Sequence, residues 1–595
     1  MNTSYTSTPE ATDDTQNRLR GWTLAGVVTA LFLSLLMAAL DGTIVDTATP
    51  RIIGDLHSFS LYSWLVTIYL LVSTTTIPLV GKLSDLFGRK WFLVGGVFVF
   101  LVGSALAGTS QTMIQLIIFR GIQGLGSGIL QTLTLILIAD LFPPNERARW
   151  LGLFSSVIVI ASVFGPLCGG WITDHFGWRW IFSINIPLGL TALIMFVIWL
   201  PKNLSGNTAS RSSWATLRQI DILGSVTIVA GTICLLLGLT LGDQTYAWNS
   251  PQVIVLFVAT VVLFLLFFFI ETHVQDPILP LDLFKNQVFS AGALLSLLLG
   301  MVLFAIIVYL PLFVQVVQGQ SPTSSGAIIT PLTITIAVLS IITGGIVSKL
   351  GRYQIVSVVG SIILAGGVFL MTQMNTLTSS LEISRNVFLI GIGLGILMPL
   401  INVATQNALP KNRLGVGISA VTFLRSMGST LTTAVLGTIV NSISNSQINA
   451  HLPIAAHRFS DTYLKAATEK QVLTSAGYRH SIVQQGISAV VKSVNVPAGP
   501  QHDTTIASIA QQTTTLLNQV FEVVRKALET GIHQSFQINF YLCLVIIVIT
   551  LFLKDTASTQ AEETKQEERV IAHKEEHTRA EKHNVFNRRT RNVVF

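Results

Sequence analysis

The chain has 595 residues, of which 50% are hydrophobic and only 11% are charged, and its mean hydropathy is +0.64. Soluble domains carry about 25% charged residues, so this composition excludes an ordinary soluble protein and favours a chain embedded in a lipid bilayer. The formal net charge is +7, but the basic residues are scattered between apolar runs, which argues against nucleic acid as a partner. The cysteines lie inside apolar runs, with neither disulfide nor metal-ligand spacing: Cys168, Cys234 and Cys543.

In chain order, a polar tail over 1–20 is followed by fourteen apolar runs, each about long enough for a helix to cross the roughly 30 Å of hydrocarbon in a bilayer. The sequence therefore predicts an all-α integral membrane protein with fourteen transmembrane helices, followed by a charged tail over 554–595. The runs are 22–48, 62–81, 91–108, 113–139, 151–173, 179–200, 220–241, 251–270, 287–312, 327–348, 354–374, 384–407, 414–440 and 535–553.

The charges between the runs predict the orientation. If the N-terminus is cytoplasmic, the basic residues of the short outer loops are only Arg51, Arg179 and Arg385, whereas the inner segments contain many more lysines and arginines. This asymmetry satisfies the positive-inside rule. Both tails are therefore expected in the cytoplasm, and the chain in the plasma membrane.

Two motifs of the first half of the sequence recur in the second half at nearly the same offset. They predict an internal repeat of six helices. The segment 81–90 resembles 345–353, and the glycines of 121–126 resemble those of 391–395. Repeated helical halves are typical of secondary transporters, which bind substrate where the repeats meet. The predicted units are an N-terminal six-helix bundle over 21–200, a linker with two extra transmembrane helices over 201–286, and a C-terminal six-helix bundle over 287–553 that includes a long extracellular loop over 441–534.

Within that loop, apolar residues recur at helical spacing between Ile506 and Leu528. This pattern predicts an amphipathic helix packed on the extracellular face. A gate or a partner-binding cap is the alternative.

The first apolar run contains a carboxylate. Asp41 follows twenty uncharged residues, and the run stays apolar until about Pro50. A carboxylate inside a membrane helix is costly unless it faces a cavity or a partner, so it marks an ion or substrate pathway. We expect Asp41 in the outer half of the membrane; the alternative is that the helix ends at Leu40 and Asp41 meets water.

Three motifs resemble a single family. GKLSDLFGRK over 81–90 is similar to the loop signature of the major facilitator superfamily, and GPLCGG over 165–170 is similar to its antiporter motif. LDGTIVD over 40–46 resembles the first-helix motif of fourteen-helix drug:proton antiporters of the EmrB/QacA type, and 178–189 and 425–428 are also family-like. The resemblance implies a major facilitator fold with two six-helix bundles and two inserted linker helices.

The resemblance also implies a proton-coupling role for Asp41 and for Arg120 in the fourth helix. A membrane arginine stays charged and needs a partner, for which Asp41 is one candidate; a structural role for Arg120 is the alternative. Asp46 stands where the family commonly has Asn, and it is either part of the coupling site or a water-exposed helix end. For Arg425 in the thirteenth helix, a role in proton coupling and a role in holding neighbouring helices together are weighted equally.

The antiporter motif has small residues and a proline, which let helices approach closely, and in the family it is thought to seal the substrate path. Its presence favours export over uptake. Its residues are Gly165, Pro166, Gly169 and Gly170.

The loop motif is expected to form a cytoplasmic gate. Asp85 could accept hydrogen bonds from the start of the thirteenth helix near Arg413, and such a contact would favour the outward-facing state. The residues of this gating loop are Gly81, Asp85, Gly88, Arg89 and Lys90.

The substrate pocket is less well marked. No acidic residue occurs in the ninth to thirteenth runs, which favours monovalent cationic or neutral lipophilic substrates. Aromatic and amide side chains could line the pocket, although each is also typical of helix packing: Trp64, Tyr69, Gln123, Phe304, Tyr309, Gln315, Asn402 and Gln406.

Together these features predict proton-coupled efflux of lipophilic compounds by alternating access, with no enzyme activity and no cofactor. The sequence has no phosphate-binding GxxxxGK[ST] loop, so the proton gradient is the expected energy source. The expected partners are a small lipophilic substrate and the bilayer, and the chain is expected to be a monomer. One alternative is a dedicated exporter of a lipid, siderophore or secondary metabolite, which a basic or apolar pocket would favour. Another is a non-transporting sensor or assembly protein built around 441–534.

Overall fold

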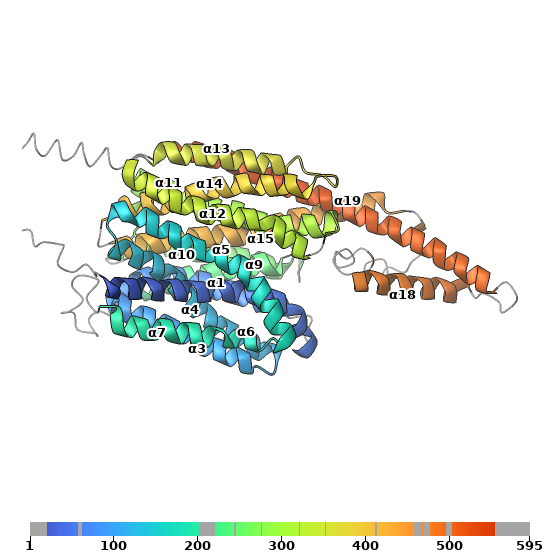
Figure 1. Cartoon of the computed structure of the whole chain (residues 1–595), viewed down its shortest axis with the longest axis horizontal. Helices are drawn as coiled ribbons and strands as arrows, with labels where there is room; N and C mark the ends of the chain where they lie inside the picture. The colour runs from blue at the N-terminus through green and yellow to red at the C-terminus, as the bar shows by residue number, and fades with distance from the viewer. Residues whose placement is uncertain are drawn as a thin grey trace, which may run out of the picture.

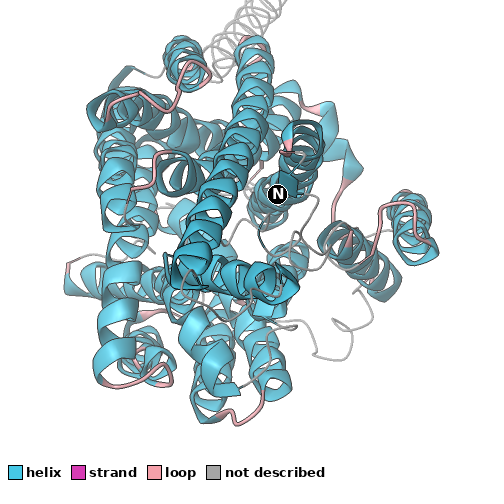
Figure 2. Cartoon of the chain, turned by 90° about the vertical axis from the view of Figure 1, so that its right-hand side faces the viewer, coloured by secondary structure: helices cyan, strands magenta, loops and turns pink. Residues whose placement is uncertain are grey.

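The computed structural model describes residues 21–56, 62–201, 221–242, 246–274, 277–320, 322–350, 353–410, 413–453, 455–456, 467, 476–494 and 502–553. Within these ranges the regular elements are helices, which run side by side as a bundle (Figures 1 and 2). The helices of the first half are α1 (Trp22–Leu56), α2 (Tyr62–Phe87), α3 (Arg89–Thr109), α4 (Met113–Leu141), α5 (Pro144–His175), α6 (Trp180–Ser183) and α7 (Asn185–Trp199).

A helical hairpin, α9 (Ile222–Leu241) and α10 (Pro251–Glu271), separates the first half from the second. The second half contains a short 3₁₀ helix, η3 (Leu281–Lys285), and a short π-helix, η4 (Phe313–Val317). Its longer helices are α11 (Gln287–Leu312), α12 (Pro322–Leu350), α13 (Gln354–Met371), α14 (Ser380–Asn407), α15 (Leu414–His451), α18 (Ala476–Val494) and α19 (His502–Thr550).

Over its described part, each expected apolar run lies in one of these helices to within a few residues at its ends, with the sixth run divided between α6 and α7. Eleven helical segments in the described ranges are long and apolar enough to cross a membrane. The chain is therefore a multi-pass membrane protein, as the composition predicts. The number of fourteen spans stays a prediction, because α2, α5 and α15 are not among the eleven.

Glycines bring the helices of the two halves together in the same way. A Cβ on Gly124 of α4 would lie 2.7 Å from the Tyr69 carbonyl oxygen of α2, and one on Gly126 would lie 2.6 Å from Phe100 of α3. In the second half, Gly391 and Gly393 of α14 make the equivalent close approaches to α12 and α13. Close packing of this kind needs small residues, which explains the repeated glycine motif.

The two halves are closed against each other at one end of the bundle. We call this the Asp85 end, and the opposite end, from which α18 and part of α19 project, the α18 end (Figure 1). Near the Asp85 end, a Cβ on Gly81 of α2 would lie 2.3 Å from the Ser419 Oγ of α15. A Cβ on Gly152 of α5 would lie 2.4 Å from the Ser340 carbonyl oxygen of α12.

The segment 441–534 differs from the expected loop. α15 continues to His451, and α19 is one helix of 49 residues that joins the expected amphipathic segment directly to the last apolar run. At 1.5 Å per residue, α19 is about 73 Å long. From Leu517 to Ile546 its apolar stripe, which includes Val524 and Phe536, is buried, and this burial stabilises the helix across the expected boundary between loop and membrane span.

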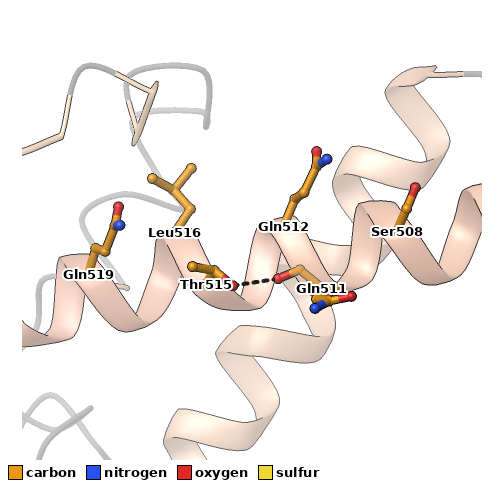
Figure 3. A pocket seen from close by; sticks show the side chains of 6 residues that line it. All are labelled: Ser508, Gln511, Gln512, Thr515, Leu516 and Gln519. Atoms are coloured by element: carbon orange, nitrogen blue, oxygen red, sulfur yellow. Dashed lines mark hydrogen bonds between the residues drawn. The ribbon is translucent and has the colours of Figure 1, made fainter.

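A hollow of about 460 Å³ lies against the projecting part of α19 (Figure 3). Its described lining residues come from α19 alone and are mostly polar: Ser508, Gln511, Gln512, Thr515, Leu516 and Gln519. This hollow lies outside the apolar part of the bundle, so it is not a candidate for a substrate site within the membrane.

Candidate proton-coupling site

Asp41 lies inside an unbroken membrane helix. α1 runs from Trp22 to Leu56, so the alternative in which the helix ends at Leu40 is wrong. The Asp41 side chain is 1% exposed. Because burying an unpaired carboxylate costs several kcal/mol, the structure must supply partners.

Three side chains from two helices contact the Asp41 carboxylate. Arg120 of α4 forms an ion pair with it and is equally buried. Gln123, one turn further along α4, donates from Nε2 to Asp41 Oδ1 at 2.7 Å, and Asn185 of α7 donates to the same oxygen at 2.9 Å. Ser104 of α3 accepts from both amides, at 3.2 Å and 3.0 Å. We call these five residues the Asp41 cluster.

Arg120 has further partners that fix its position. Its guanidinium stacks over the Tyr69 ring of α2, 4.1 Å from the ring centroid, and its Nη1 donates to Gln123 Oε1 at 3.0 Å. The Tyr69 hydroxyl donates to Ser127 of α4 at 2.7 Å. The ion pair therefore sits in a polar network that joins α1, α2, α3, α4 and α7, and every one of these helices belongs to the first half.

The Asp41 cluster lies nearer the α18 end than the Asp85 end. Asn185 is the first residue of α7, Arg120 is in the third turn of α4, and Ser104 is in the second-last turn of α3. These termini all belong to the α18 end. The cluster is thus separated from the closed contacts near Asp85 by more than half the length of the helices.

The antiporter motif packs directly beside the cluster. A Cβ on Gly165 of α5 would lie 1.9 Å from Thr43 Oγ1 of α1, and that hydroxyl reaches the Ala161 carbonyl oxygen of α5 at 3.0 Å. The contact is two residues beyond Asp41 on α1. Gly170 has open space around its Cα, and the side chain of Pro166 lies outside the described part of the structure.

The gating loop carries a second polar cluster. Arg89 forms ion pairs with Asp85, at 3.0 Å, and with Asp140 of α4. Lys90 donates to the Val197 and Leu200 carbonyl oxygens at the end of α7. Burial raises the pKa of the Asp85 carboxyl above its ordinary value, while the Arg89 guanidinium lowers it. Gly88 lies between α2 and α3 with φ of 86°, a conformation that favours glycine.

Asp85 also touches the start of α15, although not through Arg413. Its carboxylate lies against Gly415, where a Cβ would come within 2.6 Å of both oxygens. A carboxylate is favourable at a helix N-terminus because of the helix dipole. Arg413 pairs with Asp282 of η3 instead, because the exposed Asp282 lies within its reach and Asp85 is already engaged by Arg89.

The residues proposed for the substrate pocket separate into two groups. Tyr69 and Gln123 belong to the polar network around Asp41. The others are buried or half-buried, and the structure records no hydrogen bond between their side chains in its described part: Trp64, Phe304, Tyr309, Gln315, Asn402 and Gln406.

The other coupling candidates are not part of the Asp41 cluster. The Asp46 side chain lies outside the described residues. Arg425 is on α15, in the other half, and the described structure shows no contact between it and the cluster.

Sequence reasoning missed Ser104 and Asn185 as site residues. Asn185 was a recognisable signal, because it is an amide inside an apolar run and within the family-like stretch 178–189. Ser104 was not recognisable, because serine is tolerated in membrane helices without any site nearby.

The family model of the Major Facilitator Superfamily matches this chain over residues 31–221 and again over 220–433. The chain belongs to the major facilitator superfamily. The Bacillus subtilis multidrug transporter protein MdtP is 34% identical over 547 residues, which cover 91% of this chain and 96% of that protein. Multidrug resistance protein 3 of Bacillus subtilis is 37% identical over 71% of this chain and 81% of that protein.

Among solved structures, the proton:xylose symporter XylE of this superfamily matches with a TM-score of 0.50 and 16% identity, over 72% of this chain and 90% of that chain. At this identity the likeness concerns the fold alone. It agrees with the two similar halves seen here.

Proposed function

We propose that this protein is a proton-coupled exporter of lipophilic compounds that works by alternating access in the plasma membrane. The observation that carries the proposal is the buried Asp41–Arg120 pair with its two amide donors. A carboxylate at this depth is expected in a transporter that moves protons. The names of the Bacillus subtilis relatives, a multidrug transporter and a multidrug resistance protein, support the export direction.

The proposed coupling step is a change of partner at Asp41. When the carboxylate accepts a proton, it no longer balances the Arg120 charge, and both side chains must rearrange because a buried cation needs a counter-charge or strong acceptors. Gly165 packs two residues away on the neighbouring helix α5, and α5 also packs along α12 of the second half. A shift of α1 near Asp41 would therefore reach the interface between the halves through α5.

The charge asymmetry of the loops supports placing the Asp85 end in the cytoplasm, with both tails there. The state described here would then be outward-facing, because the contacts of Gly81, Gly152 and Asp85 with the second half close that end. The Asp41 cluster would face the side from which protons enter.

The proton gradient is the proposed energy source, no cofactor is needed, and a monomer is sufficient for the mechanism. No acidic residue lies in the ninth to thirteenth apolar runs, which supports neutral or monovalent cationic substrates. Arg425, a basic residue in the second half, supports instead the alternative of a dedicated exporter. A non-transporting sensor has weaker support, because the one feature that favours it is the projecting part of α19.

The test is proton-driven dye uptake into inverted vesicles, where export appears as uptake. N-phenyl-1-naphthylamine, a neutral lipophilic dye, should accumulate with the parent protein when the lumen is acidic and should not accumulate with Asp41→Asn. The control is Gly95→Ala on α3, which meets open space and should transport like the parent. Equal transport by the parent and Asp41→Asn would exclude Asp41 as the coupling acid, and no proton-driven transport of any dye by a folded parent would overturn the exporter proposal.

A further inference from the structure

Arg425 is a charged side chain in the middle of the membrane helices and has no partner among the described residues. Among the residues that the structure describes, its guanidinium forms no hydrogen bond, ion pair or ring contact. α15 begins at Leu414 near the Asp85 end, so at 1.5 Å per residue Arg425 lies about 16 Å into the bundle. This is close to half of the roughly 30 Å of hydrocarbon.

The surroundings of α15 place this charge inside the protein. α15 packs along α2, α4, α9, α11, α14 and α19, which belong to both halves and the linker. On either side of Arg425 in sequence, Phe423 and Met427 are buried in a cluster with Leu71 of α2 and Leu236 of α9. The Arg425 backbone packs against Gly300 of α11. Arg425 is therefore at the level where the two halves meet.

The Arg425 side chain is only partly buried, although α15 is surrounded by other helices. A partly exposed side chain on a helix that packs against both halves faces space between the helices. A membrane arginine stays charged, and it is tolerated where it faces water or a counter-ion. The position thus has the properties of a binding site in the translocation path.

No acidic side chain between residues 287 and 440 is placed to neutralise Arg425. Between residues 287 and 440 the only acidic residue is Glu382, which is used in the capping box at the start of α14 with Ser379. In the first half, Asp41 is already paired with Arg120. Among the described residues, no carboxylate contacts Arg425 in this state.

We propose that Arg425 binds an acidic group, such as a carboxylate, sulfonate or phosphate, on the substrate itself. A guanidinium binds such groups through paired charge-assisted hydrogen bonds. This inference rests on the proposed export function and makes its substrate class more specific: lipophilic compounds that carry an anionic group. It replaces the sequence-based preference for cationic compounds. That preference rested on the absence of acidic residues from the ninth to thirteenth apolar runs and did not take the charge of Arg425 into account.

The test uses two dyes that share one aromatic skeleton. 8-Anilino-1-naphthalenesulfonate carries a sulfonate, and N-phenyl-1-naphthylamine has none. Binding of each dye to the full-length protein in nanodiscs is measured against empty nanodiscs, for the parent, Arg425→Gln and Arg425→Lys. We expect the ratio of sulfonate-dye to neutral-dye affinity to fall at least tenfold in Arg425→Gln and less than threefold in Arg425→Lys, which keeps the charge.

An equal loss of both dyes in a folded Arg425→Gln protein would overturn the proposal, because it would indicate a structural role. An unchanged affinity ratio would overturn it as well. Arg147→Gln is the control, since it removes the charge of an arginine that lies outside the proposed sites, at the start of α5. There the affinity ratio of the two dyes should stay within twofold of the parent.

The anion could also be a small inorganic ion that accompanies a neutral substrate. Repeating the measurements with gluconate in place of chloride separates the two sources. If chloride competes with the sulfonate dye in the parent and not in Arg425→Gln, the substrate-anion site is supported. If transport of the neutral dye requires chloride and loses this requirement in Arg425→Gln, the anion is a co-ion and the proposal fails.

Failure of the export function can be recognised separately. If the sulfonate dye binds in an Arg425-dependent manner but neither dye is moved by a proton gradient, the anion site stands and the exporter proposal fails. If the neutral dye is transported and the sulfonate dye shows no dependence on Arg425, the exporter stands and the anion site fails.

Discussion

The Asp41–Arg120 pair should contribute to stability as a coupled unit, and a double-mutant cycle can measure this. Removing one partner of a buried ion pair costs about 3–5 kcal/mol, because the other charge stays buried without compensation. In Asp41→Asn, Arg120 keeps the Gln123 acceptor at 3.0 Å and the Tyr69 ring at 4.1 Å. A desolvated cation–π contact is worth about 2 kcal/mol, so we expect a cost near the lower limit, about 3 kcal/mol.

The reverse substitution, Arg120→Gln, leaves the Asp41 carboxylate with the amide donors of Gln123 and Asn185, at 2.7 Å and 2.9 Å. We again expect a cost of about 3 kcal/mol, because two neutral donors do not replace a counter-charge. The double variant buries no charge. Its cost should therefore be lower than the sum of the single costs by at least about 2 kcal/mol.

The assay is reversible unfolding of the purified protein by sodium dodecyl sulfate in mixed micelles, followed by tryptophan fluorescence. The control is the same cycle on Asp282 and Arg413, an ion pair whose side chains are 51% and 41% exposed. Exposed pairs contribute about 0–1 kcal/mol. If the Asp41 cycle is additive, or its coupling energy is no larger than that of the control cycle, the pair is not a coupled buried unit and the reasoning is refuted.

Three further outcomes are expected. Gly165→Val should abolish dye transport, because its Cβ would lie 1.9 Å from Thr43 Oγ1, whereas Gly95→Ala, which meets open space, should transport normally. Normal transport by Gly165→Val would show that α1 and α5 can separate freely. Gly415→Ala should open the Asp85 end, because its Cβ would lie 2.6 Å from the Asp85 carboxylate. In a background without other cysteines, this variant should increase maleimide labelling of Ser340→Cys several-fold. Gly95→Ala, which meets open space, should not increase the labelling. Spin labels at Ser508 and Thr530, both exposed on α19, should give one narrow distance near 33 Å, as 22 residues of helix require; a broad distribution would contradict a continuous helix.

The sequence alone determined the environment of the chain and the order of its helices. A low charged fraction and apolar runs of membrane length admit few alternatives, because exposed backbone groups and charges are costly in lipid. The same reasoning marked Asp41 and Arg120, since an ionisable residue inside an apolar run needs a partner. The glycines of the antiporter motif likewise indicated a close helix approach, and the missing Cβ of Gly165 permits the contact that the structure shows there.

The tertiary structure decided which partners these residues have. Asn185 and Ser104 join Asp41 from helices that are distant in sequence, and a single polar residue in an apolar run does not reveal which neighbour it faces. Asp85 reaches Gly415 and not Arg413 for the same reason. The length of α19 also depended on packing, because turns of polar residues such as 511–515 form a stable helix only when the opposite face is buried. Arg425 shows the limit most clearly: its charge could be read from the sequence, but the lack of a counter-charge among the described residues around it is a property of the assembled helices.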